Sequence, residues 1–200
     1  MLKAAVCCQS LIKKLQYQPP LASQSPVSLY ATAKTLLNIV RTHYESKEQL
    51  QKYKSRSKNG LLVWEKIIAK KYFAVPGRLL DIGCGSGREA FALSQMGHEI
   101  TGIDISEEEI QAANQLSKRL NENIDFRVTD GICLNFPTDY FNYITFWSQV
   151  IGNIPRSHSR LAFLKECFRV LRLSGIISVS FHNREVCELQ ATKTRDNSIK

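Results

Sequence analysis

Residues 79–87, LLDIGCGSG, join a short apolar run directly to three glycines with the spacing G-x-G-x-G. An apolar run of this length that ends in glycines is typical of a buried β-strand followed by a tight turn. Glycine is required where the backbone adopts conformations that a side chain disfavours, or where a ligand approaches the backbone closely. The stretch therefore predicts a strand, a turn and a helix, with a ligand bound at the turn.

Strand-like runs and helical patterns alternate along the chain after this turn. The expected strands are RLLDIG, HEITGID, IDFRVTD, FNYITFW and IISVSFH, which begin at Arg78, His98, Ile124, Phe141 and Ile176. The expected helices between them cover residues 86–97, 106–123 and 157–175, and Gly175 is expected to close the last one. This alternation predicts an α/β fold with a doubly wound, Rossmann-like, mostly parallel sheet that carries helices on both faces.

The segments on either side of this sheet divide the chain into three parts. Residues 1–58 are expected to form a helical arm, broken by a loop at Pro19-Pro20. Residues 59–188 form the expected α/β domain, which opens with a helix over residues 61–73. Residues 189–200 are a short polar tail.

The composition favours a soluble cytoplasmic protein. The 200 residues carry a formal net charge of +9, which is concentrated in the N-terminal arm, and 44% of them are hydrophobic. Apolar runs stay well below the roughly 20 residues that cross a bilayer, which speaks against a membrane protein. The six cysteines form no CxxC pair, so we expect reduced thiols, with Cys133 and Cys167 in the core, and no metal site.

Acidic residues end the second and third expected strands, where open parallel sheets bind their ligands. Asp104 ends the second strand and Asp130 the third. A carboxylate at a strand end is held rigidly and accepts two neighbouring hydroxyl donors, such as those of a ribose. A nicotinamide dinucleotide also contains ribose, but its fingerprint G-x-G-x-x-G requires a glycine where this chain has Arg88. A dehydrogenase is therefore disfavoured.

LLDIGCGSG followed by GIDIS resembles motifs I and II of the class I S-adenosylmethionine-dependent methyltransferases, of the type 11/25 group. The resemblance implies S-adenosylmethionine as the cofactor. It implies that Gly83, Gly85 and Gly87 make room for the methionine portion, and that Asp81 orients it. It also implies that Asp104 accepts both ribose hydroxyls.

The resemblance extends to the residues expected around the adenine ring. Asp130 matches the family's acidic residue that contacts the adenine amino group, and Ile105 would pack against the ring. The expected cofactor-binding set is completed by Cys84, Gly131, Ile132 and Trp147.

The segment FWSQVIGNIP, which follows the fourth expected strand, favours a small-molecule acceptor methylated at oxygen or nitrogen. It lacks the Asn/Asp-Pro-Pro-aromatic motif, the Pro-Cys pair and the paired glutamates that the family uses for bases and for arginine. His158 and His182 are the candidate catalytic bases, although His158 is expected to lie in solvent. The arm is a candidate substrate lid. Two alternatives remain: an RNA or protein acceptor held by the basic arm, and a non-catalytic cofactor-binding domain.

Members of the family usually continue after the fifth strand with a helix and an antiparallel pair of strands. This chain resembles a C-terminally shortened member, because residues 189–200 are too few for these elements. The fifth strand is then expected to lie at the edge of the sheet, where unpaired backbone groups favour association with another chain. The sequence does not indicate an oligomeric state.

Overall fold

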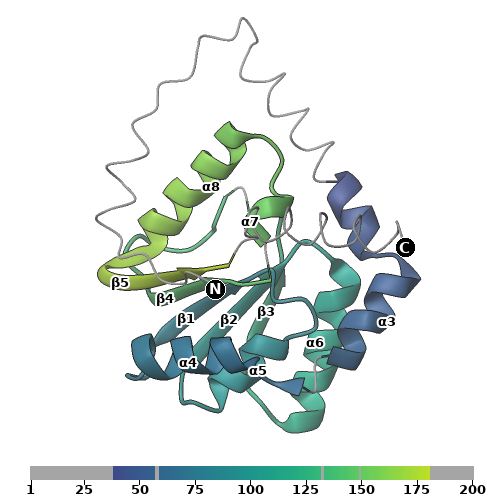
Figure 1. Cartoon of the computed structure of the whole chain (residues 1–200), viewed down its shortest axis with the longest axis horizontal. Helices are drawn as coiled ribbons and strands as arrows, with labels where there is room; N and C mark the ends of the chain where they lie inside the picture. The colour runs from purple at the N-terminus through teal and green to yellow at the C-terminus, as the bar shows by residue number, and fades with distance from the viewer. Residues whose placement is uncertain (1–37, 57–58, 132, 149, 181–200) are drawn as a thin grey trace, which may run out of the picture.

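The computed structural model describes residues 38–56, 59–131, 133–148 and 150–180. Its centre is a five-stranded sheet (Figure 1). The strands are β1 (Arg78–Ile82), β2 (Glu99–Asp104), β3 (Asp125–Val128), β4 (Phe141–Phe146) and β5 (Leu171–Val179). Their order is β3-β2-β1-β4-β5, and every neighbouring pair is parallel. The order reverses between β1 and β4, and the predicted doubly wound sheet is confirmed.

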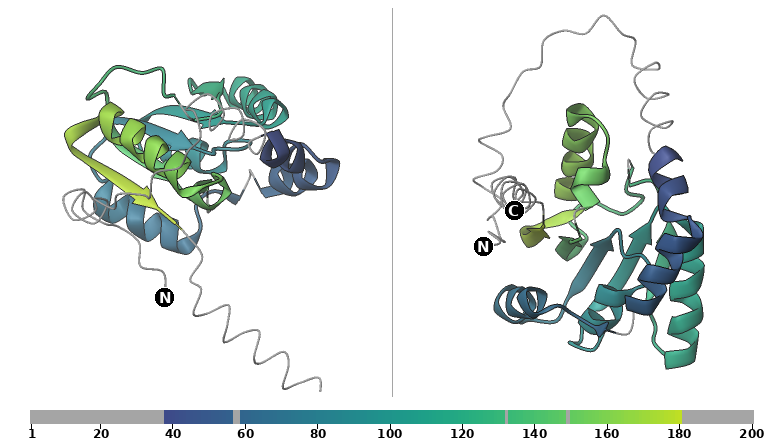
Figure 2. Two further views of the ribbon diagram at one scale, coloured as in Figure 1. Left: turned by 90° about the horizontal axis from the view of Figure 1, so that it is seen from above. Right: turned by 45° about the vertical axis from the view of Figure 1, so that its right-hand side comes forward.

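Helices cover both faces of this sheet (Figure 2). They are α3 (Lys47–Arg56), α4 (Val63–Tyr72), α5 (Arg88–Ser94), α6 (Glu107–Leu120), α7 (Val150–Asn153) and α8 (Ser157–Val170). Residues of α4, α5 and α6 pack in one hydrophobic cluster, and residues of α8 pack in another. The helix α3 packs against α6.

The side chains of β1 show why both faces must be covered. Successive side chains of a strand point to opposite faces of the sheet. Leu79 belongs to the cluster under α4, α5 and α6, while Leu80 belongs to the cluster under α8, and both are fully buried. An apolar run without alternation therefore corresponds here to a strand between two layers of helices.

The transition from α8 to β5 differs from the prediction. The helix ends at Val170 and the strand begins at Leu171, so the predicted helix does not extend to Gly175. Leu171 is buried and pairs with Phe141, and the register then shifts before Ile176 pairs with Tyr143. A Cβ atom on Gly175 would lie 2.6 Å from Leu171 Cγ. Gly175 therefore permits a tight irregularity inside β5 rather than ending a helix.

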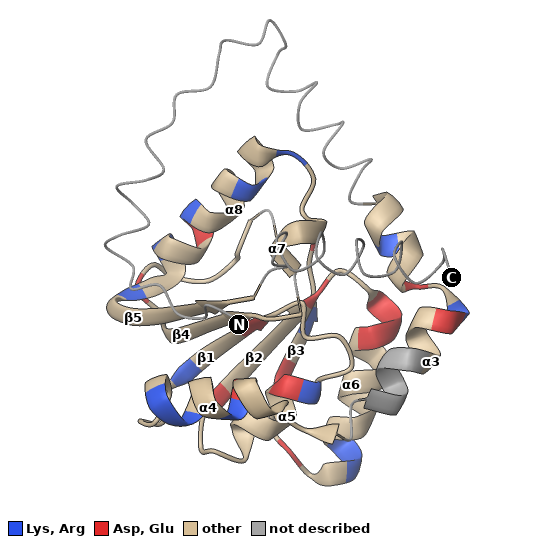
Figure 3. Cartoon of the chain, in the orientation of Figure 1, with Lys and Arg blue, Asp and Glu red and all other residues tan. Residues whose placement is uncertain are grey.

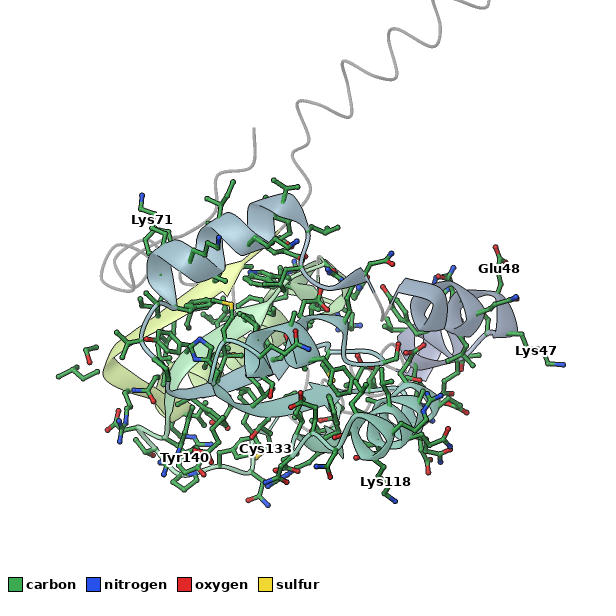
Figure 4. The ribbon with its side chains drawn as sticks, turned by 90° about the horizontal axis from the view of Figure 1, so that it is seen from below. Lys47, Glu48, Lys71, Lys118, Cys133 and Tyr140 are labelled. Carbon is green, nitrogen blue, oxygen red and sulfur yellow. The ribbon has the colours of Figure 1, made fainter. Side chains whose placement is uncertain are left out.

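The two cysteines that were expected in the core have different environments. Cys167 is buried on α8, as predicted. Cys133 is exposed, so that prediction is wrong, and Figure 4 shows it near the rim of the molecule. Cys133 lies between β3 and β4 and is not part of a helix or strand.

Charged residues are distributed unevenly over the described part of the molecule (Figure 3). Acidic residues occupy the first turn of α6, next to the carboxyl ends of the strands, whereas α4 carries exposed lysines. Among the helices of the described ranges, none is long and apolar enough to cross a bilayer.

Candidate cofactor site

A cavity of about 480 Å³ lies at the carboxyl ends of the strands. Its walls come from the turn after β1, the end of β2 and the loop after β3, with α7 and part of the N-terminal arm on the other side. Its size falls within the range of small-ligand pockets. This is the edge at which the predicted motif residues were expected to meet.

The three motif glycines have different roles in the structure. Gly83, Gly85 and Gly87 all adopt left-handed conformations, with φ of 73°, 51° and 90°. A Cβ atom on Gly83 would collide with Val150, whereas one on Gly85 would meet only Glu109 Oε2, at 3.6 Å. The cavity is therefore most open at Gly85, and the space over Gly83 is taken by α7.

Gly87 differs from what the resemblance implied. It does not line the cavity, and a Cβ atom on it would lie 2.7 Å from Phe91 Cε2 and 3.0 Å from Phe126 Cζ. Both rings are buried, so neither can move aside without disturbing the core. Gly87 is required because α5 packs closely on the sheet.

Asp104 is fixed at the end of β2 by two backbone hydrogen bonds. The N–H of Gly85 donates to Oδ2 and the N–H of Ser106 donates to Oδ1, both at 2.9 Å. Burial raises the pKa of Asp104, and these backbone donors oppose the increase. Each carboxylate oxygen retains a further lone pair, so Asp104 can still accept the two hydroxyls of a ribose from within the cavity.

The loop after β3 forms the next part of the wall. Asp130 and Gly131 line the cavity together with Ile105, which follows β2. Phe163 of α8 also lines this part, where a Cβ atom on Gly131 would lie 3.6 Å from the ring. The sequence did not identify Phe163, because it follows the same helical spacing as the core residues of α8. The predicted contact residue Ile132 lies outside the described residues.

Asp81 lies beneath the turn rather than on the cavity wall. It is 2% exposed, and its Oδ1 accepts a 2.9 Å hydrogen bond from Thr145. Within the described ranges no group is hydrogen-bonded to its Oδ2. Burial, followed by the neighbouring Glu89, raises the pKa of Asp81 well above its usual range. A buried carboxyl oxygen of this kind suits a polar ligand group or a water at the turn.

A charged cluster next to the turn was not predicted. Arg88 donates to both carboxylate oxygens of Glu65, at 2.7 and 2.8 Å, and it also contacts Glu89. Ser148, after β4, donates to Glu89 Oε1 at 3.3 Å and has a left-handed φ of 54°. Burial, with Glu65 adding to it and Arg88 opposing it, raises the pKa of Glu89 to about 7. The signal available in sequence was the adjacent Arg88-Glu89 pair on an otherwise apolar helix.

The remaining site candidates lie away from the cavity or outside the described residues. Trp147 is 2% exposed, and its Nε1 donates a 2.8 Å hydrogen bond to Ser178 Oγ, so it is a core residue that does not reach the cavity. His158 is exposed in the first turn of α8 and does not line the cavity either. His182 falls outside the described residues.

Part of the cavity wall is apolar and comes partly from the N-terminal arm. Val40, Leu62, Val150 and Ile154 line it. Tyr44 also lines it and accepts a 2.7 Å hydrogen bond at its hydroxyl from Asn153 Nδ2, which connects the arm to α7. The part of the predicted arm that the structure describes therefore forms one wall of the cavity.

The residues present fit a nucleoside ligand that carries a longer substituent. Asp104 is held ready for a pair of hydroxyls, Ile105 and Phe163 offer apolar contacts for a ring, and Gly85 leaves the backbone accessible. Among the described residues, no group of three His, Cys, Asp or Glu side chains is arranged to hold a metal ion.

The sequence is similar to those of known methyltransferases. Residues 79–175 match the family described as a methyltransferase domain. The chain is 29% identical over 114 residues to a ubiquinone biosynthesis O-methyltransferase of Xanthomonas campestris, and 33% identical over 119 residues to a demethylmenaquinone methyltransferase of Tropheryma whipplei. These matches cover 56% and 58% of this chain and 46% of each relative. The chain thus spans less than half the length of these relatives.

A solved structure shows the same relationship at the level of the fold. An S-adenosylmethionine-dependent methyltransferase from Methanosarcina mazei is 26% identical, with a TM-score of 0.58, over 66% of this chain and 64% of its own. The matched region includes the glycine turn and the strand ends that line the cavity. Residues 79–175 therefore match the methyltransferase-domain family, and the chain is similar to an S-adenosylmethionine-dependent methyltransferase of known structure.

Proposed function

We propose that this chain binds S-adenosylmethionine in the cavity and transfers its methyl group to an oxygen or nitrogen atom of a small molecule. The observation that carries the proposal is the continuity of the cavity. One cavity is lined both by Asp104, which is suited to a ribose, and by the apolar side chains of Val40, Leu62, Val150 and Ile154. A cofactor and an acceptor can therefore share one space.

Methyl transfer from a sulfonium requires an aligned nucleophile more than it requires a reactive side chain. Holding the two reactants in line supplies a large part of the acceleration. The described residues contribute to this by forming a cavity with apolar walls and by joining the arm to α7 through Tyr44 and Asn153. A base is needed only where the acceptor must lose a proton.

The apolar wall and the relatives together favour a ring-shaped acceptor of low polarity. The relatives' names refer to ubiquinone and to demethylmenaquinone, which are quinones. An acceptor with an aromatic ring and a hydroxyl group would place its ring against Val150 and Ile154 and its hydroxyl next to the polar groups of Tyr44 and Asn153. We propose this class of acceptor.

The direct test uses S-adenosylmethionine labelled in its methyl group, with a panel of catechols, quinols and, as a contrast, total RNA. Label in an aromatic product that disappears in Asp104→Ala would support the proposal. Transfer to RNA alone would favour a nucleic-acid acceptor held by the basic arm. Binding of the cofactor without transfer to any acceptor would favour a non-catalytic cofactor-binding domain.

A further inference from the structure

The described residues that line the cavity have an unbalanced charge. Four of them are acidic, Glu89, Asp104, Glu109 and Asp130, and Arg88 is the single basic one within these ranges. Buried Asp81 and Glu65 lie close behind the same turn and add to the negative charge. A cavity of this kind favours a ligand group with positive charge.

We propose that the Glu89 carboxylate binds the ammonium group of the cofactor's methionine portion, and that Arg88 and Ser148 hold the carboxylate in place for this contact. The proposal rests on the cofactor binding proposed above and deepens it. It assigns a specificity-determining contact to a residue outside the glycine motif.

The position of Glu89 gives it one fixed oxygen and one available oxygen. Glu89 lies in the first turn of α5, directly after the motif turn, and its side chain lines the cavity although the residue is only 7% exposed. Its Oε1 accepts from Ser148 Oγ at 3.3 Å and is contacted by Arg88. Among the described residues, the two side-chain donors to this carboxylate, Arg88 and Ser148, both contact Oε1, and the backbone N–H of Glu89 itself also interacts with the carboxylate. These side chains therefore leave Oε2 to a donor in the cavity.

Arg88 does not neutralise Glu89 fully, because it is already bound to another carboxylate. Its guanidinium makes a bidentate pair with Glu65, which has a fully buried side chain, and donates to the carbonyl of Gly60 at 2.9 Å. Glu65 in turn accepts from the N–H of Leu62 at 2.6 Å. The bidentate pair keeps Arg88 in one orientation. The single positive charge of Arg88 is thus shared between Glu65 and Glu89. The negative charge that it does not neutralise lies on the cavity side, at Glu89.

The order of the strands places Glu89 on the side of the cavity where the amino-acid portion of the cofactor is expected. The carboxyl ends of β3, β2, β1 and β4 follow one another across the sheet. Asp130 follows β3 and Asp104 ends β2, so the nucleoside is expected on that side. The turn that carries Glu89 follows β1, and Ser148 follows β4. A ligand whose nucleoside contacts Asp104 therefore extends its amino-acid portion toward Glu89.

The electrostatics of Glu89 are consistent with this contact. Burial raises the pKa of its carboxyl to about 7, which shows that its negative charge is poorly compensated in the structure. An ammonium group at hydrogen-bond distance would favour the ionised form. The two partners would form a short, charge-assisted hydrogen bond.

The test compares a ligand that has the ammonium group with a ligand that lacks it. S-adenosylhomocysteine carries the ammonium, whereas methylthioadenosine has the same nucleoside and thioether without the amino-acid portion. Calorimetric titration of both ligands is made with the wild type, with Glu89→Gln and Glu89→Asp, and with Glu99→Gln as the matched control. Glu99 is exposed at the amino end of β2, on the opposite edge of the sheet.

We expect Glu89→Gln to weaken binding of S-adenosylhomocysteine by about tenfold or more, with methylthioadenosine binding changed by less than about twofold. Glu89→Asp should recover part of the loss, and Glu99→Gln should bind both ligands as the wild type does. Unchanged S-adenosylhomocysteine affinity in Glu89→Gln would overturn this proposal alone, and so would an equal loss for both ligands. Failure of both ligands to bind the folded wild type would overturn the proposed function as well.

Discussion

The backbone N–H of Gly85 donates a 2.9 Å hydrogen bond to Oδ2 of Asp104, which joins the turn after β1 to the end of β2. The second oxygen of the same carboxylate holds the N–H of Ser106, whose hydroxyl in turn accepts from the N–H of Glu109 at the start of α6. The two sequence motifs are therefore parts of one hydrogen-bonded unit. A change at Asp104 alters the shape of the cavity as well as its charge.

Substitution of the motif glycines should lower the stability of the fold by different amounts. Gly87→Ala should lower the free energy of unfolding by about 2 to 4 kcal/mol, because its φ is 90° and the new methyl group meets Phe91 and Phe126. Gly85→Ala should lower it by roughly 1 to 2 kcal/mol, since it has only the left-handed backbone to overcome. Urea denaturation measures both changes. Equal losses would contradict the packing role given to Gly87.

Trp147 should contribute to stability and not to binding of the cofactor. Trp147→Phe removes the hydrogen bond to Ser178 and alters the stacking on Phe73, so we expect a loss of about 1 to 3 kcal/mol in the free energy of unfolding. The affinity for S-adenosylhomocysteine, measured on the folded fraction, should stay within about twofold of the wild type. If Trp147→Phe lowered the affinity for S-adenosylhomocysteine without lowering stability, Trp147 would be a residue of the cavity wall and not of the core.

Glu89 should make the stability of the wild type depend on pH. The pKa of its carboxyl is raised from 4.5 to about 7, so between these values the folded chain keeps a proton that the unfolded chain has lost. Stability therefore falls as the pH rises through this window. The groups that act on Glu89 are Arg88, Glu65, Asp81 and Ser148.

Comparison with the variant Glu89→Gln measures how much Glu89 contributes to the pH dependence of stability. Glu89→Gln keeps the shape of the side chain but cannot ionise, so its free energy of unfolding should fall less than that of the wild type between about pH 4.5 and pH 7. Parallel urea titrations at several pH values measure the difference. Identical pH profiles for the two chains would show that Glu89 titrates normally.

The contact between Tyr44 and Asn153 should stabilise the arm locally. Tyr44→Phe removes a 2.7 Å hydrogen bond, which contributes about 0.5 to 1.5 kcal/mol. We expect amide hydrogen exchange in residues 38–44 to become faster by up to about tenfold, with little change in the strands. Tyr72→Phe on α4 serves as the control, and it should leave exchange in residues 38–44 unchanged. Unchanged exchange in Tyr44→Phe would mean that other contacts hold the arm.

The sheet could be predicted from the sequence because its signals are local. The apolar run before Gly83, the strand that ends at Asp104 and the strand that precedes Asp130 each carry their own strand and turn residues. Parallel topology then follows from the alternation with helices. The same reasoning brought Gly85, Asp104 and Asp130 to one edge, where the structure has its cavity.

Features that depend on contacts between distant segments could not be predicted. Gly87 belongs to the same glycine-rich turn as Gly85, and its packing role depends on Phe126, which follows almost 40 residues later. The change from helix to strand at Leu171 depends on its pairing with Phe141 rather than on local propensity. The buried pair of Arg88 and Glu65 joins α4 to the motif helix, and neither residue shows alone that it is buried.

The glycine turn and Asp104 are expected to form a working binding site for S-adenosylmethionine. Calorimetric titration of S-adenosylhomocysteine into the wild type, Asp104→Ala and Asp125→Ala tests this expectation. Asp125 is an exposed control at the amino end of β3. We predict one-to-one binding to the wild type and Asp125→Ala, and a loss of about 100-fold in Asp104→Ala, which lacks the acceptor for two hydroxyls. A folded wild-type chain that does not bind S-adenosylhomocysteine, or an Asp104→Ala chain that binds it as well as the wild type, would contradict a cofactor site at Asp104.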